Sequence, residues 1–201
     1  FEKKATPTKE VIPTTKSATI KTLPSRRKFL KYAASVFVIV AAGLAYFFTK
    51  SPNYDQLFAQ SFAVDRTSIK NLLDKVGQSS IGKDNDRIDL GRGLNAFLKD
   101  DLAESTDILQ TYVGQHPDDL DAQYYLGLFQ LARGQILNAQ QTLLPISSSK
   151  NKYQDAARWY LGLAYLKNPE TVDNARVIFE LLAKTDDSLY QVRAQEIVNQ
   201  L

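Results

Sequence analysis

Apolar residues from position 52 to the end of the chain recur at intervals of three and four, and the breaks in this pattern fall at glycine and proline. This spacing gathers apolar side chains on one face of a helix, whereas a half-buried strand would alternate every second residue. The pattern therefore predicts an all-α fold for this part of the chain. Residues 32–49 differ, because they are apolar on every side.

This apolar run reads YAASVFVIVAAGLAYFFT; it carries no charge and is followed by Lys50. A helix of this length covers about 27 Å, close to the ~30 Å hydrocarbon core of a bilayer. A buried helix of a soluble domain would show a polar stripe, whereas this run has tyrosine and phenylalanine near its ends, as at a membrane interface. Residues 32–49 are therefore predicted to form a single transmembrane helix.

The basic character of the chain is concentrated before this run. Residues 1–32 hold nine Lys/Arg and two Glu, and the remainder has a net charge of about −4. Residues 1–31 are rich in Lys, Thr and Pro, and we expect a disordered tail. The positive-inside rule leaves this tail in the cytoplasm and places the part of the chain after about residue 50 on the other side of the membrane. The flanking charges are Arg26, Arg27, Lys28 and Lys31.

Residues 25–31, SRRKFLK, also resemble the twin-arginine export motif. A cleaved signal needs small residues just past its apolar core, and this region reads FFTKSPNY. An uncleaved anchor is therefore favoured, and an exported protein or enzyme with a removed signal is an alternative. The chain begins with Phe1, so we expect it to be a fragment of a longer protein.

The residue inventory leaves little room for catalysis. The chain has no cysteine and one histidine, His116, which excludes thiolate chemistry, the common zinc sites and histidine-based triads. Residues 91–96 fit G-x-G-x-x-A without a preceding strand, and the acidic run from Asp84 lacks the glycine and glutamate of a calcium loop. We expect no catalytic residue, metal or cofactor, and the acidic folded part argues against nucleic acid.

Three segments of the chain repeat. Leu126-Gly127 recurs as Leu161-Gly162 after 35 residues, and Gly93 lies 34 residues before Gly127. Stacked together, the segments resemble the tetratricopeptide repeat, a helix-turn-helix unit of 34 residues, over about half of the chain. The matching positions are Gly93, Leu102, Leu109 and Pro117; Leu126, Gly127, Gly134, Ile136, Ala139 and Leu143; and Trp159, Leu161, Gly162, Tyr165, Ala175, Phe179 and Leu182.

The resemblance implies a short α-solenoid of three units over residues 84–201, preceded by a linker and flanking helices over residues 52–83. A final capping helix is expected from Ser188. The first unit departs from the family pattern, since Arg92 and Ser105 replace the usual leucine and alanine and its turn lacks glycine. Small residues should let the paired helices touch backbone to backbone. The packing positions are Gly93, Gly127, Ala139, Gly162, Ala175 and Phe179.

The resemblance also implies a concave groove lined by the first helix of each unit. Its lysine and asparagine clamp for a terminal carboxylate is absent, because apolar residues and Tyr124 occupy those positions. Either an apolar or helical peptide of a partner binds there, with Tyr124 and Trp159 as anchors, or the helices of residues 54–76 fill the groove. The groove positions taken as the candidate site are Arg87, Leu94, Tyr124, Leu128, Trp159 and Leu163.

In layout the chain resembles bacterial inner-membrane proteins with one N-terminal anchor and a periplasmic repeat domain. This resemblance implies a non-enzymatic, membrane-anchored adaptor that binds a protein or peptide during envelope protein assembly or translocation. An organelle import receptor with cytosolic repeats is an alternative with the same order of parts. Association between copies of the chain is also open, because a short solenoid exposes its terminal faces.

Overall fold

The computed structural model describes residues 40, 53–79, 87–186 and 188–201. These residues form nine α-helices and one short 3₁₀ helix without any strand, which confirms the all-α prediction for them. No helix within these ranges has the length and apolar character needed to cross a bilayer. The predicted span over residues 32–49, apart from Val40, and the basic flank Arg26, Arg27, Lys28 and Lys31 lie outside the described residues.

The helices follow one another through short connections, except where residues 80–86 intervene. Their bounds are α2 Tyr54–Ser61, α3 Arg66–Ser79, α4 Ile88–Leu98, α5 Leu102–Gln115, α6 Leu120–Ala132, α7 Ile136–Ser148, α8 Gln154–Leu166, η2 Pro169–Thr171, α9 Val172–Ala183 and α10 Gln191–Val198.

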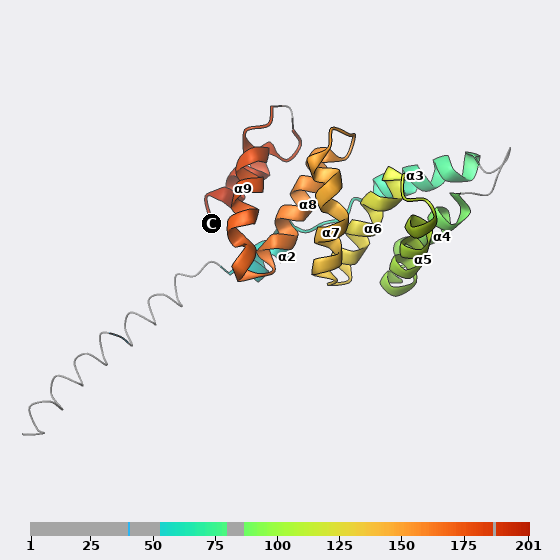
Figure 1. The fold of residues 1–201 in the computed structure, drawn as a ribbon, viewed down its shortest axis with the longest axis horizontal. Coiled ribbons are helices and arrows are strands. Elements are labelled where there is room, and N and C mark those ends of the chain that lie inside the picture. The colour runs from blue at the N-terminus through green and yellow to red at the C-terminus, as the bar shows by residue number, and fades with distance from the viewer. Residues whose placement is uncertain (1–39, 41–52, 80–86, 187) are drawn as a thin grey trace, which may run out of the picture. The chain divides into compact units, whose positions relative to one another are not determined.

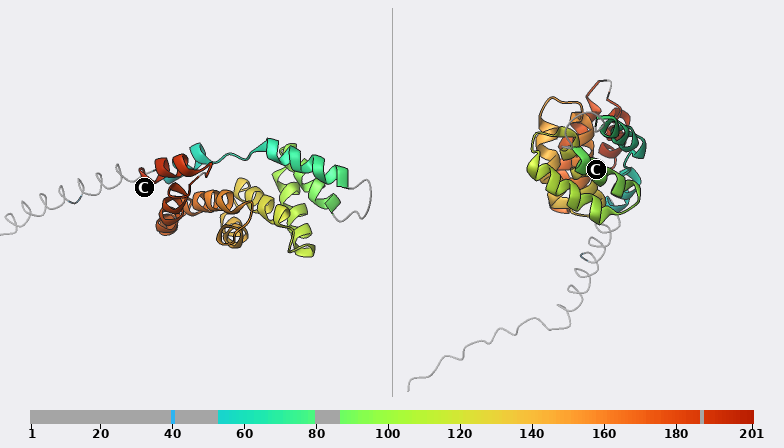
Figure 2. Two further views of the ribbon diagram at one scale, coloured as in Figure 1. Left: turned by 90° about the horizontal axis from the view of Figure 1, so that it is seen from above. Right: turned by 90° about the vertical axis from the view of Figure 1, so that its right-hand side faces the viewer.

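Three helical hairpins, α4–α5, α6–α7 and α8–α9, stand side by side in a row (Figure 1). Each hairpin also packs against the next, through α5 with α6 and α7 with α8. The helix α10 covers α9 at one end, and α3 packs on α4 at the other. Viewed from above, α2 and α3 run along one side of the row and are joined by the non-helical residues 62–65 (Figure 2).

A large side chain lies over a glycine inside each hairpin. A Cβ atom placed on Gly93 or on Gly127 would lie 2.8 or 2.7 Å from a leucine of the second helix, Leu109 or Leu143. On Gly162 it would lie 2.7 Å from Phe179 Cζ. The prediction that the paired helices touch backbone to backbone is therefore wrong in detail, because in each hairpin a side chain of the second helix packs on the glycine of the first. The partner alanines of the second helices, Ala139 and Ala175, are fully buried, as is Phe179.

Local chemistry explains the turns within and between the hairpins. The Asp101 and Asp119 side chains cap α5 and α6 by accepting hydrogen bonds from the backbone N–H groups of Glu104 (2.9 Å) and Ala122 (3.2 Å). After α6 the backbone turns through Gly134 at φ 79°. The first hairpin has no glycine there, and Asp100, 34 residues earlier, adopts the same left-handed conformation at φ 65°.

The last helix begins later than expected. The Ser188 hydroxyl accepts a hydrogen bond from the Tyr190 backbone N–H (3.3 Å), and α10 starts at Gln191. Within α10, Ala194 and Ile197 are buried against the preceding hairpin, whereas Val192 is exposed. This short helix covers an apolar face that the third hairpin cannot cover by itself.

Candidate functional site

The predicted groove residues lie in the interior of the folded chain. Leu94, Leu128 and Leu163 are at most 2% exposed, and Trp159 and Tyr124 are 1% and 7% exposed. They come from the first helices α4, α6 and α8, which places them on one side of the hairpin row. As folded, these five side chains contact other parts of the chain instead of solvent.

The predicted anchor Trp159 is covered from the C-terminal end. Its indole stacks on the Tyr190 ring with 5.3 Å between centroids and meets the Phe179 ring edge to face at 5.5 Å. The Arg193 guanidinium lies 4.4 Å from the indole centroid, at cation–π distance. The region around α10, which is neither a partner peptide nor part of residues 54–76, therefore covers this expected anchor.

The second predicted anchor, Tyr124, belongs to an aromatic cluster. Its ring stacks on Tyr153 with 4.1 Å between centroids and an interplanar angle of 7°. Tyr125 and Tyr160 meet it edge to face at 5.2 and 6.4 Å. Burial raises the pKa of the Tyr124 hydroxyl well above its usual range. This cluster joins α6 to α8 and leaves Tyr124 no open side for an anchor role.

Residues 53–65, which we call the strap, lie against α8 and α10 (Figure 2). The Tyr160 hydroxyl donates a hydrogen bond to the backbone carbonyl of Ala63 (2.6 Å). The Arg193 guanidinium donates one to the carbonyl of Ser61 (3.0 Å). Two side chains of the folded domain therefore hold backbone carbonyls at the end of α2 and in the non-helical part of the strap.

Aromatic rings and one ion pair complete the contact. Phe58 and Phe62 stack on each other with 5.2 Å between centroids, and Phe62 meets the Tyr160 ring edge to face at 6.0 Å. The Lys167 ammonium lies 5.1 Å from the Phe58 ring centroid and pairs with Asp55. The surface that receives the strap, which we call the strap face, consists of Tyr160, Lys167 and Arg193.

The helix α3 covers α4, at the other end of the side formed by the first helices. It buries Ile69, Leu72 and Val76, and Val76 and Leu73 contact α4 beside Gly91. The α4 side of the predicted groove is thus occupied by the chain itself. At the start of α3, Arg66 reaches the Leu98 carbonyl and pairs with Asp100, and its guanidinium lies 5.7 Å from the Phe97 ring centroid.

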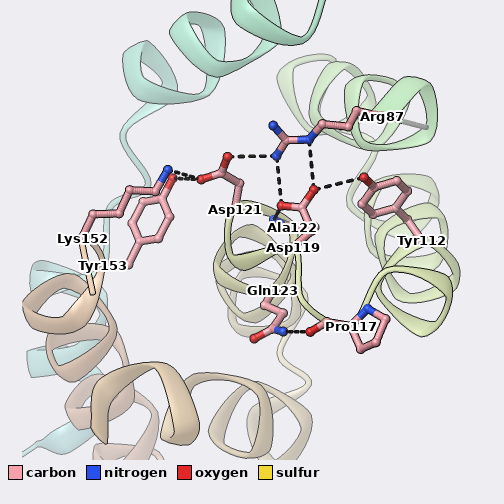
Figure 3. Close-up of polar contacts among 9 residues, drawn as sticks. All are labelled: Arg87, Tyr112, Pro117, Asp119, Asp121, Ala122, Gln123, Lys152 and Tyr153. Carbon is pink, nitrogen blue, oxygen red and sulfur yellow. Dashed lines mark hydrogen bonds and ion pairs between the residues drawn. The ribbon is translucent and has the colours of Figure 1, made fainter. Parts of the chain in front are cut away.

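A polar network joins the starts of α4, α6 and α8 (Figure 3). Arg87 donates to both oxygens of Asp119 (3.0 and 2.9 Å) and to Asp121 (2.9 Å). The Tyr112 hydroxyl also donates to Asp119 (3.0 Å), and the Tyr153 hydroxyl donates to Asp121 (2.8 Å). Lys152 forms an ion pair with the same Asp121 carboxylate.

The network holds Asp121 in its charged form. Burial alone would raise the pKa of this carboxyl, but hydrogen bonds from Lys152, Arg87 and Tyr153 outweigh it and lower the pKa to about 2. Burial alone would lower the pKa of Arg87, but Asp121 and Asp119 raise it beyond its usual range. The predicted groove residue Arg87 is therefore committed to linking two hairpins.

A polar cavity of about 360 Å³ lies between this network and α3. Its walls carry charged and hydrogen-bonding side chains from both sides, which is the composition of a wet pocket. Burial raises the pKa of the Tyr125 hydroxyl in its wall to about 12. The residues that line it are Ser68, Asn71, Leu72, Lys75, Arg87, Asp121, Tyr125, Lys152 and Tyr153.

An apolar groove of about 340 Å³ lies on the second helices, between α7 and α9. Leu144, Val177 and Leu181 line it and are exposed at 49%, 65% and 47%. Ile178 and Tyr165 form further parts of its wall. None of these positions belongs to the groove predicted from the repeat.

The strap face was missed because its residues lie outside the repeat's groove positions. Tyr160 follows the predicted Trp159 directly, and Lys167 and Arg193 lie at the end of α8 and in α10. The polar network had a detectable signal in the sequence, since Arg87 and Asp121 carry opposite charges and lie 34 residues apart, which is one repeat length. Such a pair at equivalent positions of neighbouring units indicates a contact between them.

The described residues contain no group of three or more His, Cys, Asp or Glu side chains placed to hold a metal ion. The acidic residues of the network are instead neutralised by Arg87 and Lys152. Comparisons with models of known protein families, with curated proteins and with solved structures found no match to this chain.

Proposed function

We propose that this chain is a membrane-anchored adaptor of the tetratricopeptide type that binds a peptide segment of a partner protein on the strap face. The observation that carries the proposal is the pair of hydrogen bonds from Tyr160 and Arg193 to backbone carbonyls of the strap. Side chains that hold main-chain oxygens recognise a peptide largely independently of its sequence. Here they stand beside aromatic rings that supply buried contact area.

The repeat architecture supports the same proposal. Three hairpins with a large side chain over an equivalent glycine form a row in which each unit contacts its neighbours. Such rows present extended surfaces, and their usual role is to bind other proteins. The proposed anchor over residues 32–49 places this surface beside a membrane, on the side opposite the basic tail.

Topology is tested with a reporter fused after Leu201. An enzyme that is active only outside the cytoplasm should be active in this fusion, and one that is active only inside should be silent. The reverse result would contradict the proposed side of the membrane. A purified protein that starts near residue 50 would favour the exported, signal-cleaved alternative.

Partner binding is tested by photo-crosslinking in cells from a single photoreactive residue at Lys167, on the strap face. The matched control is Gln110, an exposed position on α5. A crosslinked partner is expected from Lys167 and not from Gln110. If no crosslinked partner forms from any surface position, the adaptor function is wrong.

A second surface is favoured by a separate observation, the exposed apolar groove between α7 and α9. Large exposed apolar side chains that line a groove are typical of protein interaction sites. A photoreactive residue at Val177 reports on this groove in the same experiment. Crosslinks from Val177 without crosslinks from Lys167 would move the binding site to this groove.

A further inference from the structure

The strap occupies the strap face in the manner of a bound peptide. Its recognised features are an acidic residue, Asp55, aromatic rings at Phe58 and Phe62, and the carbonyls of Ser61 and Ala63. We propose that the strap is a resident peptide, and that the partner segment has this same chemistry and binds by displacing it. This inference rests on the proposed adaptor function and names both its partner class and its regulation.

The contacts define what the strap face accepts. The Lys167 ammonium contacts both the Asp55 carboxylate and the Phe58 ring. It therefore favours a bound peptide in which an acidic residue lies one helical turn before an aromatic residue. The Tyr160 ring contacts a second aromatic residue, Phe62, which lies four positions after Phe58. The Tyr160 hydroxyl donates a hydrogen bond to the carbonyl of the next residue, Ala63. A matching peptide carries an acidic residue, two aromatic residues spaced by four, and an extended segment after them.

The strap is held weakly enough to leave. In α2 only Leu57 is buried, and complete burial of a leucine contributes about 1.5–3 kcal/mol. The other apolar side chains of the strap that pack on the core, Tyr54, Phe58, Phe62 and Val64, are only partly buried. The Asp55–Lys167 pair adds little, because Asp55 is largely exposed. Segments with few buried apolar contacts open at low free energy without global unfolding.

The next helix stays in place when the strap leaves. Ile69, Leu72 and Val76 of α3 are buried, and the Asp65 carboxylate caps its first turn by accepting from Thr67 N–H and Ser68 Oγ (2.9 and 2.6 Å). The non-helical residues 62–65 therefore provide a hinge between a firmly packed helix and a loosely packed one. The Tyr160 ring is 5% exposed while the strap is bound, and departure of the strap exposes it. Burial of this apolar surface then favours binding of another peptide.

The test uses the full chain in detergent and a fluorescein-labelled synthetic peptide with the sequence of residues 53–66, measured by fluorescence anisotropy. The double substitution Phe58→Ser, Phe62→Ser weakens the strap and leaves the strap face intact. It is expected to bind the peptide at least tenfold more tightly than the unmodified chain. The matched control Gln60→Ser, at an exposed position of the same helix, should bind like the unmodified chain.

Two further arms locate the binding site. Adding Tyr160→Phe to the double variant removes the hydroxyl that holds a strap carbonyl, and should weaken peptide binding several-fold. A peptide in which both phenylalanines are serine should not bind. Circular dichroism and the fluorescence of Trp159 check folding, and Phe62→Ser alone is the milder variant if the double variant is unfolded.

Equal affinity of the unmodified and strap-weakened chains, or no binding to any folded variant, would overturn the proposal. So would binding that is indifferent to Tyr160→Phe and to loss of the peptide's aromatic rings. These results differ from failure of the adaptor function, because a partner crosslinked from Val177 or Lys167 in cells would still establish that function.

Discussion

The hairpin row and the strap belong to the same folded unit but are held by different contacts. In the row, Leu109, Leu143 and Phe179 are fully buried and each lies directly over a glycine of the paired helix. The strap buries one leucine and otherwise relies on half-buried rings and on hydrogen bonds to its backbone. Close packing inside the row resists any change of volume, whereas contacts of the strap can be exchanged for similar contacts of another peptide.

A short row of hairpins can thus cover the apolar side formed by its first helices in two ways, without a partner. At the α4 end, α3 is packed as an integral part of the fold, and at the α8 end the strap is a peripheral part. The strap and α3 are adjacent in sequence, and residues 62–65, at the end of the strap, join α2 to α3. The hinge therefore lies between a helix that belongs to the packed core, α3, and a helix that only lies on its surface, α2.

Ile69→Ala and Leu57→Ala should differ most in their effect on stability. Ile69 is fully buried between α3 and the row, so its truncation should lower the free energy of unfolding by about 3 kcal/mol. Leu57→Ala should lower it by less than about 1 kcal/mol, because the strap opens separately from the row. Denaturant unfolding followed by circular dichroism measures both.

Hydrogen exchange sharpens the same contrast. In Leu57→Ala, amides of the strap should exchange faster while those of α6 and α8 stay protected. If Leu57→Ala is as costly as Ile69→Ala and all amides exchange together, the strap unfolds with the row and the comparison breaks down.

The next effect concerns the glycines inside the row. Gly127→Ala places a Cβ atom 2.7 Å from the Leu143 side chain, so this side chain or its helix must shift, at a cost of about 2 kcal/mol. The control Gly114→Ala lies in α5 with no atom within 4 Å of the added Cβ. It should stabilise the helix by up to about 1 kcal/mol. Similar midpoints of thermal unfolding for the two variants would show that the row accommodates the extra volume.

A smaller effect is expected at the turn of the second hairpin. Gly134 has φ 79° and no atom within 4 Å of an added Cβ, so the cost of Gly134→Ala comes from backbone conformation alone. We expect a loss of about 1 kcal/mol in the free energy of unfolding. Unchanged stability would mean that the turn relaxes, and that the row is less rigid than its packing indicates.

The smallest effect is expected in the polar network around Asp121, and acid unfolding measures it. The folded pKa of Asp121 is lowered to about 2 from an ordinary 3.8, so its carboxylate stabilises the fold above about pH 4. This contribution is lost as the pH falls toward 2. Asp121→Asn should remove part of the pH dependence between these limits, by less than about 1 kcal/mol because the network is partly solvated.

The matched control for the acid experiment is Asp89→Asn, which breaks an exposed pair with Arg92 inside α4. It should leave the acid unfolding curve nearly unchanged. Identical curves for Asp121→Asn and the unmodified chain would show that the network does not link the hairpins energetically.

The helical class and the pairing of helices within each hairpin follow from the amino-acid pattern alone. Apolar spacing fixes which face of each helix is buried, and the glycines at positions 93, 127 and 162 mark where a large side chain can approach. The Asp119 cap was also predictable, because an aspartate before an apolar helix satisfies free N–H groups whatever the fold.

The sequence left open whether a partner or the helices of residues 54–76 cover the first helices, and in the folded chain its own segments lie there. Burial of Trp159 depends on α10, and the role of Tyr160 depends on Ala63, which lies 97 positions away in sequence. Periodicity describes one helix at a time and carries no information on which distant segment meets its apolar face. That choice follows from the shape and charge of surfaces that exist only once the row has formed.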